Sequence, residues 1–457
     1  MKLTVFPSDK GDCLLLTSHD GHHVLIDGGM SRSYRRYVAP RLEALGTAGQ
    51  KLDVVYVSHT DQDHIGGILT LAEDAFLWKV FATHLGATPD DGQSDAPDGF
   101  RRPRDRARPP AIDKFWYNAF SAALPNVNGE FETTLVRVAT ALAAASGSDV
   151  MRQAALATRE LVASVGDGIQ LNNRLDKRQL GYPLNPEFGG DLMQIESDGA
   201  DVPAPLPIGS MRFHVIGPFR EDLEKFARYW QEWIEKNTAE LKRLEEERRD
   251  DERDLLPNEF ERLHGRLNAL ATRLGDRGKV TPPNLASLMF FVEEDRRSIL
   301  LTGDGHGQDI LRGLERQGKL DADGGIHVDV LKVQHHGSEN NLDEEFCRRV
   351  TANNYVFCAN GAHENPDLRV LEAIVDSRIG PARSRSKNSQ TKNRFRFWFN
   401  NSSTFDDEIN AENKGHMALV EADIASYISQ SGDQLSATFI TDDRWRSKKR
   451  LELSVGG

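Results

Sequence analysis

Short apolar runs bounded by turn residues recur along the chain, and each predicts a short buried strand. Residues 13–16 and 24–26 flank Asp20-Gly21, which is a strong signal for a hairpin turn. A helix is expected over about 32–45, and it leads to the apolar run 54–57. The first part of the chain is therefore predicted to contain short strands, a helix and a further buried strand.

Strand character returns after a long central region. Residues 211–218 have strand character, and residues 288–292 and 298–301 flank the charged turn 293–297. Residues 328–333 are a further buried run. We expect a second group of strands here, separate from the first.

The two long segments between and within these groups have helical spacing. Residues 131–175 are rich in Ala and Leu and predict one or two packed helices, after an exposed loop over 86–110. Residues 220–277 are highly charged, with apolar residues spaced by threes, fours and sevens, which predicts a helical hairpin. The hairpin is either an arm that binds a protein partner or a solvated structural insertion, and the sequence does not separate the two.

Four potential metal ligands follow the run 54–57 within six residues, in His59-Thr60-Asp61-Gln62-Asp63-His64. We expect Gly66-Gly67 to let the backbone turn sharply after them. Imidazole and carboxylate groups at this density suit one or two divalent metals. The alternative is a capped helix start, but a cap needs only one such residue.

Metal-competent residues also follow two later strands. Asp304 ends the run 298–301, and His335-His336 follow the run 328–333. Asp27, at the end of the run 24–26, is either a turn residue or an acid that orients the ligands. A single polar residue at a strand end is usually structural, but three sets indicate a shared metal site at one edge of the strands.

Composition narrows the class of protein. The 457 residues allow two to three domains, or one large domain with insertions. No apolar run is long enough for a membrane span, and the start 1–6 reads as a strand rather than a signal peptide. Three cysteines without metal-binding spacing argue against a disulfide framework, so we expect a cytoplasmic protein without a membrane partner.

The net charge of −13 means that the surface as a whole does not attract polyanions. Two basic segments, 101–108 and 383–396, are local exceptions, although each can be an ordinary solvated loop. Residues 393–399 alternate basic and aromatic side chains. This pattern is typical either of a half-buried strand or of a surface that binds phosphates and stacks on bases.

These motifs resemble the metallo-β-lactamase superfamily, whose motif is His-x-His-x-Asp-His followed by Gly-Gly, with a later Asp and a final His. Asp61 stands at the second His, a variant that resembles the ComEC-type branch. Further stretches are similar to that branch: 25–29, 284–288, 300–304, 331–338 and 358–366. The resemblance implies an α/β fold, an αββα sandwich over residues 1–375 with a helical insertion at about 86–206 and the charged helical hairpin at 219–277. Residues 376–457 would be a C-terminal extension, first basic and aromatic and then strand-like.

The resemblance also implies two divalent metal ions, Zn or Mn. His59 and Asp61 would hold one ion, Asp63 and His64 the second, and Asp304 would bridge them. One residue of the pair His335 and His336 would close the second site, because successive strand residues face opposite sides. The sequence leaves open which of the two is the ligand. We place His335 with the metal ligands, and His336 with the catalytic residues Asp63 and Lys332. Asp27, Ser338 and His363 are expected around the ligands.

Two positions differ from the family pattern. Its third His would fall on an intervening strand, and His84 and His214 are the plausible positions. Its last block carries His before Pro, whereas Asn365 precedes Pro366 here, so His363 could substitute. Replacing imidazole by carboxylate at Asp61 moves the preference from zinc towards manganese or magnesium.

The expected function is metal-dependent hydrolysis by a metal-activated hydroxide, with a phosphodiesterase or nuclease favoured. Lys332 and Ser338 are candidate phosphate contacts, and Lys332 can equally be a sheet-edge lysine. A small-molecule hydrolase, acting on a cyclic nucleotide, lactone or thioester, is the alternative. An interaction protein with a vestigial metal site is the second alternative. The expected partners are a nucleic acid or nucleotide substrate and a protein that binds the hairpin 219–277.

Overall fold

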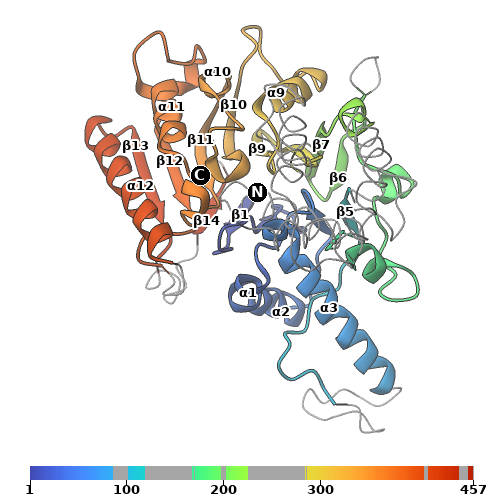
Figure 1. Ribbon diagram of the computed structural model, residues 1–457. Helices are drawn as coiled ribbons and strands as arrows, with labels where there is room; N and C mark the ends of the chain where they lie inside the picture. The colour runs from blue at the N-terminus through green and yellow to red at the C-terminus, as the bar shows by residue number, and fades with distance from the viewer. Residues whose placement is uncertain are drawn as a thin grey trace, which may run out of the picture.

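The computed structural model describes residues 1–85, 101–118, 167–168, 170–196, 202–224, 284, 286–405, 410–441 and 451–455 (Figure 1). Most of the helical segment expected over 131–175 lies outside these residues. The charged hairpin expected over 219–277 also lies outside them beyond residue 224.

The N-terminal strands form a six-stranded sheet in the order β14-β1-β2-β3-β4-β5. Its strands are β1 (Lys2–Val5), β2 (Leu14–Thr17), β3 (His23–Ile26), β4 (Val54–Val57), β5 (Phe115–Tyr117) and β14 (Leu451–Ser454). β3, β4 and β5 run parallel, so their carboxyl ends share one edge of the sheet. That edge carries the stretch that begins at Ser58.

A second sheet of eight strands has the order β13-β12-β11-β10-β9-β8-β7-β6. Its strands are β6 (Leu206–Ile208), β7 (Met211–Gly217), β8 (Met289–Glu294), β9 (Arg297–Leu301), β10 (Ile326–Lys332), β11 (Val350–Phe357), β12 (Phe395–Phe399) and β13 (Leu435–Phe439). The five strands from β9 to β13 are parallel to one another. Asp304 and the His335-His336 pair follow two of these parallel strands, and therefore leave the sheet at the same edge.

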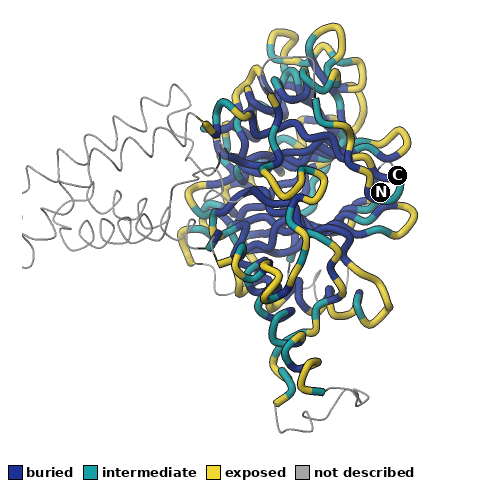
Figure 2. The backbone as a smooth tube through the Cα atoms, turned by 90° about the vertical axis from the view of Figure 1, so that its right-hand side faces the viewer, coloured by how far each residue is buried: buried dark blue, intermediate teal, exposed yellow. Residues whose placement is uncertain are grey.

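The two sheets pack face to face around an apolar core in which Tyr56, Trp116, Phe213 and Phe290 are fully buried. The Tyr56 and Phe290 rings meet edge to face at 5.0 Å, an arrangement that adds to the free energy of area burial. Figure 2 shows this buried interior. The expected α/β class with two sheets and helices is confirmed.

Helices cover both outer faces of the sheets (Figure 1). The first sheet carries α1 (Ser31–Ser33), the π-helix η1 (Tyr34–Val38), α2 (Ala39–Thr47) and α3 (Gln62–Leu85). The second sheet carries α9 (Gly307–Arg316), α10 (Glu344–Arg349), α11 (Leu368–Ile379) and α12 (Ala411–Gln430). Short 3₁₀ turns complete the described elements: η3 (Pro186–Phe188), η4 (Gln334–Gly337), η5 (Ala362–Glu364) and η6 (Ser389–Lys392).

The segment 376–457, expected as an extension, contributes strands to both sheets. β12 and β13 extend the second sheet beyond β11, and β14 pairs antiparallel with β1. The alternating stretch 393–399 contains β12, whose Phe395, Phe397 and Phe399 pack in the core beneath the helices. These three rings are therefore structural and cannot stack on bases.

Gly66 and Gly67 do not form a sharp turn, contrary to the expectation from sequence, because α3 runs without a break from Gln62 to Leu85. Their role is close packing between the helix and the turn after β3. A Cβ atom added at Gly67 would lie 2.0 Å from the carbonyl oxygen of Gly28, and one added at Gly28 would lie 2.4 Å from the amide nitrogen of Ile68. The pair Gly28 and Gly67 thus holds α3 against the end of β3, with Asp27 and His64 beside this contact.

We therefore expect Gly67→Ala to destabilise the protein by about 1–3 kcal/mol, because the added methyl group overpacks two backbones. Gly415→Ala is the matched control, since Gly415 also lies in a helix, α12, and an added Cβ would meet nothing within 4 Å. That change should stabilise by roughly 0.5–1 kcal/mol through helix propensity. Urea denaturation measures both, and equal effects of the two substitutions would contradict the packing role.

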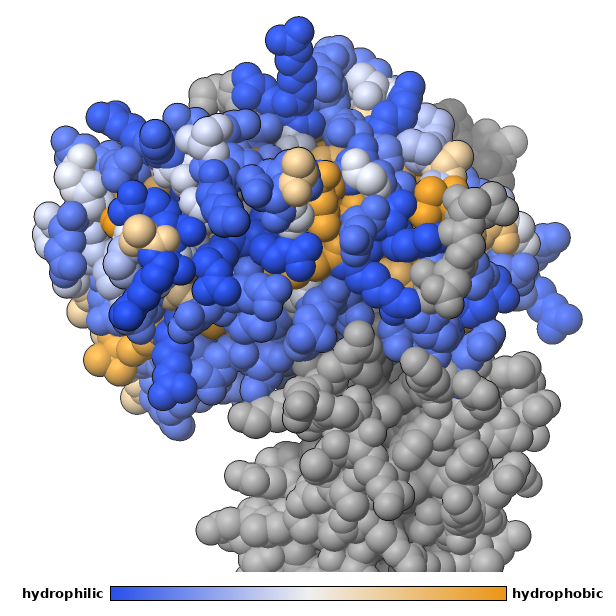
Figure 3. Space-filling view, turned by 90° about the horizontal axis from the view of Figure 1, so that it is seen from above, coloured by the Kyte–Doolittle hydropathy of each residue, from blue (hydrophilic) through white to orange (hydrophobic). Residues whose placement is uncertain are grey.

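The face of the molecule in Figure 3 is mostly hydrophilic, with hydrophobic side chains gathered only in small areas. Among the described residues, no helix combines the length and the apolar character that are needed to cross a membrane.

Candidate metal centre

Side chains from β4, β9 and β10 meet beyond the carboxyl ends of these strands, between the two sheets. Asp27, after β3, holds the start of this region together. Its carboxylate accepts hydrogen bonds from the Ser58 amide at 2.7 Å and from the Ser58 hydroxyl at 2.7 Å. This fixes the backbone just before His59. Asp27 has a left-handed φ of 53°, a conformation that Asp tolerates better than most residues.

His59, His64 and Asp304 form the centre of the cluster and are all buried. The Nε2 atom of His64 lies 3.4 Å from Asp304 Oδ1, and that of His59 lies 3.7 Å from Asp304 Oδ2. The Asp304 carboxylate thus faces two imidazoles that come from the other sheet.

The pair His335 and His336 completes the cluster from the second sheet. β10 ends at Lys332, so the alternation of strand faces does not continue through the pair. His335 and His336 both have left-handed backbone angles, with φ of 46° and 57°. Their Nε2 atoms lie 3.8 and 3.6 Å from Asp304 Oδ2. Both histidines therefore face the site, whereas strand geometry would have allowed only one.

Asp61 and Asp63 contribute a carboxylate on each side of this centre. Asp61 Oδ2 lies 3.5 Å from His59 Nε2, and Asp63 Oδ2 lies 3.3 Å from His336 Nε2. The turn before β2 packs closely against the backbone of Asp63. A Cβ atom added at Gly11 in this turn would lie 1.7 Å from the Asp63 carbonyl oxygen. Gly11 is thus required for this approach.

The outer ring nitrogens of the four histidines are all engaged as donors. His64 Nδ1 donates to Asp27 at 2.9 Å, His336 Nδ1 to the Cys358 carbonyl at 2.7 Å, and His335 Nδ1 to Asn341 Oδ1 at 2.5 Å. His59 Nδ1 lies 3.1 Å from the Ser58 hydroxyl, whose own hydrogen goes to Asp27. Each Nε2 atom is therefore left with a lone pair, and that lone pair faces carboxylate oxygens.

The imidazole lone pairs and the carboxylate oxygens face each other at distances that leave room for a cation between them. The separations of 3.3–3.8 Å are too long for good hydrogen bonds. Two ligand atoms at about 2.1 Å from one ion, at the tetrahedral angle, lie about 3.4 Å apart. In the described part of the chain, His59 Nε2, His64 Nε2 and Asp304 Oδ1 are buried without a hydrogen-bond partner. The donor set and its spacing thus fit divalent metal ions.

The electrostatics agree with this interpretation. Burial alone would lower the pKa of His64, but Asp304, Asp12 and Asp27 raise it well above its usual value. Burial alone would also lower the pKa of His336, but the nearby Asp304 carboxylate more than offsets this effect, and the pKa is raised to about 9. The carboxylates therefore attract positive charge into this buried volume, and metal ions would replace those protons.

Asp12 belongs to the site but was missed by the sequence reasoning. It lies 3.4 Å from His336 Nδ1 and 3.8 Å from His64 Nδ1, and it forms a buried ion pair with Lys332. Asp12, His64 and His336 are close enough to hold an ion themselves. Their Nδ1 atoms, however, already bond Asp27 and the Cys358 carbonyl, so we interpret Asp12 as a residue that orients the imidazoles. Asp12 precedes a strand, whereas our signal was an acid that follows one.

Lys332 lies at the carboxyl end of β10, inside the sheet rather than at its edge. Its ammonium group is buried, pairs with Asp12, donates to the Gly303 carbonyl at 3.0 Å and lies 3.6 Å from Asp304 Oδ1. Burial alone would lower the pKa of Lys332, but Asp12 and Asp304 raise it above its usual value. This geometry keeps Lys332 charged and holds its ammonium group against Asp12 and the Gly303 carbonyl.

The remaining expected residues lie further from the centre. Ser338 is buried, and its hydroxyl accepts hydrogen bonds from Asn340. His363 is exposed in η5, and no contact with the cluster is found for it in the described chain. His84 is exposed near the end of α3, and His214 in β7 pairs with Glu293 at 2.7 Å.

The strand next to β4 is β5, and it offers no histidine at its carboxyl end. Tyr117 ends β5, with its hydroxyl buried and without a hydrogen-bond partner in the described residues. Asn118 follows, and its side chain is engaged with the Met193 backbone at 2.6 and 2.8 Å. The carboxyl end of β5 thus carries Tyr117 and Asn118 beside the metal motif.

A comparison with family models finds one match, which covers part of the first sheet. Residues 8–78 match the Metallo-beta-lactamase superfamily. The matched part of the chain includes Asp12, Asp27, the 59–64 motif and most of α3. Together with the two-sheet architecture, the match supports the superfamily expected from the motifs. A search of curated proteins gives no match.

Members of this superfamily are generally metal-dependent hydrolases that hold divalent metals, usually zinc. The buried His and Asp groups around Asp304 are the candidate ligands for such ions here. The match ends before the second sheet begins, so it does not include Asp304 or the His335-His336 pair. These residues join the site through the tertiary structure.

Proposed function

We propose that this protein is a metal-dependent hydrolase of phosphodiesters, of the phosphodiesterase or nuclease type, with two divalent ions, Zn or Mn. The observation that carries the proposal is the convergence of four histidine Nε2 atoms on the Asp304 carboxylate at 3.4–3.8 Å. Asp61 lies beside His59 and Asp63 beside His336, so these residues and Asp304 would together hold the two ions.

When bound, the ions supply a hydroxide at near-neutral pH and neutralise negative charge on the attacking and leaving oxygens. The chain holds the ligands in place through Asp27, Asp12 and Asn341. His336 is the more buried of the histidine pair, with 8 % of its side chain exposed against 24 % for His335. His336 is therefore the better ligand and His335 the better group to exchange a proton with substrate. The sequence left this choice open, although it placed His335 with the metal ligands and His336 with the catalytic residues.

A basic segment further along α3, the helix that begins at the metal motif, supports a polyanionic substrate. α3 begins at the metal motif, and Trp78 follows His64 by fourteen residues, about 21 Å along the helix axis. The segment 101–108 lies against this part of α3. The guanidinium groups of Arg102 and Arg108 stack on the Trp78 ring at 4.6 and 5.3 Å. The ComEC-type resemblance favours the same substrate class.

The test measures bound Zn and Mn together with cleavage of single- and double-stranded DNA, of RNA and of a chromogenic phosphodiester. We expect two ions per chain and cleavage that is lost in Asp63→Asn. Two ions without cleavage of any phosphodiester would contradict the substrate class. Less than one ion per chain would contradict the metal centre itself, and would leave the interaction protein as the better reading.

One observation favours a small-molecule hydrolase as the second candidate. A described part of the insertion at 86–206 reaches the metal motif, because a Cβ atom added at Gly168 would lie 3.3 Å from the Thr60 methyl group. A cover over the metal centre would favour small substrates. Cyclic nucleotides, lactones and thioesters belong in the same assay, and turnover of these alone would select this candidate.

Asp61→His should shift metal preference towards zinc. An imidazole in place of a carboxylate makes the first site softer and removes one negative charge, so we expect the Zn-to-Mn affinity ratio to rise roughly tenfold or more. Metal competition followed by elemental analysis measures this ratio. Asp105→His is the control, because the Asp105 side chain is 86 % exposed in the basic segment. An unchanged ratio in Asp61→His would show that Asp61 is not a ligand.

A further inference from the structure

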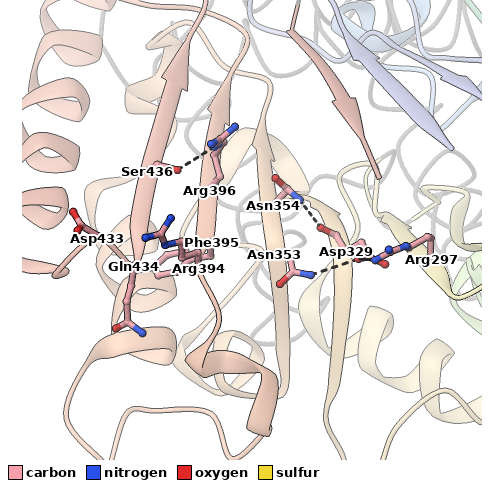
Figure 4. Close-up of a pocket in the computed structure, with 10 residues that line it drawn as sticks. All are labelled: Arg297, Asp329, Asn353, Asn354, Arg394, Phe395, Arg396, Asp433, Gln434 and Ser436. Atoms are coloured by element: carbon pink, nitrogen blue, oxygen red, sulfur yellow. Dashed lines mark hydrogen bonds and ion pairs between the residues drawn. The ribbon is translucent and has the colours of Figure 1, made fainter. Parts of the chain in front are cut away.

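A polar cavity of about 440 Å³ lies on the second sheet, well away from the metal centre (Figure 4). It is formed on the amino-terminal halves of the parallel strands, whereas the metal ligands follow their carboxyl ends. Asp329 in the cavity wall precedes His335 by six residues, about 20 Å in extended chain. The cavity is therefore separate from the candidate metal centre.

The floor of the cavity is a row of polar side chains across three strands. Asn354 of β11 is in register with Arg396 of β12, which is in register with Ser436 of β13. One step further along, Val356 and Trp398 belong to the apolar core between the sheets. The side chains thus change from apolar to polar on the same face, and this change marks the start of the cavity.

Arg396 is held in place with one edge of its guanidinium group still available. Its Nε donates to the Ser436 hydroxyl at 3.0 Å, and its guanidinium lies 5.2 Å from the centre of the Trp398 ring. Trp398 is itself fixed, because its indole N–H donates to Asn354 Oδ1 at 2.9 Å. The two terminal nitrogens of Arg396 can therefore bind an oxyanion as a fork.

A second arginine lies beside it. Arg394 is two residues earlier, on the same side of the chain, and lines the same cavity. Within the described chain, neither Arg394 nor Arg396 has a carboxylate at ion-pair distance. Arg297, the third arginine in the wall, is instead paired with Asp329 at 3.3 Å. These two arginines thus have no ion-pair partner among the described residues, while the Asp433 carboxylate lies elsewhere in the cavity wall.

We propose that this cavity is a second ligand site, which binds the phosphate group of a nucleotide-sized molecule through Arg394 and Arg396. Two guanidinium groups in one cavity wall suit a phosphate monoester, which carries close to two negative charges, better than they suit one carboxylate. The amides of Asn353 and Gln434 in the wall offer hydrogen bonds to the rest of such a ligand. The volume lies within the range of small-molecule sites.

The test is calorimetric titration of adenosine monophosphate into the full chain after metal removal with a chelator. Under these conditions the metal centre cannot bind phosphate through ions, so failure of the proposed hydrolase does not affect the result. We expect one site per chain, and an affinity reduced about tenfold or more in Arg394→Gln and Arg396→Gln. Arg396→Lys keeps the charge and the packing stem but loses the fork, and should also weaken binding.

Arg383→Gln is the matched control, since Arg383 is exposed in the loop before η6 and does not line the cavity. It should leave the affinity within about twofold, as should Asp63→Asn, which changes the metal centre alone. A single-stranded oligonucleotide titrated in parallel distinguishes a free nucleotide from a nucleic-acid phosphate as the source. Unchanged affinity in both arginine variants, no binding of either phosphate, or equal binding of citrate would overturn the proposal.

Discussion

Asp304→Asn is expected to lower both the metal content and the rate of hydrolysis. Four histidine Nε2 atoms face the Asp304 carboxylate, and no other carboxylate in the described chain has this central position. An amide keeps the shape but removes the charge and one ligand oxygen. We expect the metal content to fall from two ions to one or fewer, and kcat/KM to fall about a thousandfold or more, because several kcal/mol of charge stabilisation are lost.

Asp323→Asn controls for the loss of one negative charge, because Asp323 is exposed in the turn before β10. Elemental analysis and the phosphodiester assay should both leave this variant unchanged. The far-ultraviolet circular dichroism of Asp304→Asn should match the wild-type protein, since its effect is local. Full metal content in Asp304→Asn would contradict the bridging position.

Asp12→Asn is expected to cost the largest amount of stability of any substitution considered. Burial alone would raise the pKa of Asp12, but Lys332 and His64 more than offset this and lower it. Removing the Asp12 charge leaves the buried Lys332 ammonium with Asp304, at 3.6 Å, as its one carboxylate neighbour within ion-pair distance among the described residues. Breaking a buried pair in this way costs about 3–5 kcal/mol of unfolding free energy.

A second substitution separates the ion pair from other effects. In Asp12→Asn with Lys332→Met, no buried ammonium remains, so most of the lost stability should return. Urea denaturation with a chelator present measures both variants without any contribution from bound metal. Asp433→Asn, an exposed control, should change the unfolding free energy by less than about 0.5 kcal/mol. A double variant as unstable as Asp12→Asn alone would show that Asp12 acts other than through Lys332.

Strand positions were predictable because apolar runs bounded by glycine and acidic residues have few alternative interpretations. The run 54–57 is β4, and the run 298–301 lies within β9. The convergence of strand ends was also predictable, since parallel strands place their carboxyl ends at one edge. Pairing between distant segments was not. β14 joins β1 across the whole chain, and four residues of alternating polarity contain no information about that partner.

The local sequence by itself determined the ligand types, because His59, Asp61, Asp63, His64 and Asp304 have the chemistry of metal ligands in any conformation. Tertiary structure decided how they are used. Both members of the His335-His336 pair face the site because their backbone is left-handed, which strand periodicity does not foresee. Asp12 lies in the site because the adjacent Gly11 lets this turn pack against the Asp63 backbone. Ligand chemistry belongs to single residues, whereas orientation depends on contacts between segments far apart in the chain, and only the folded protein brings these together.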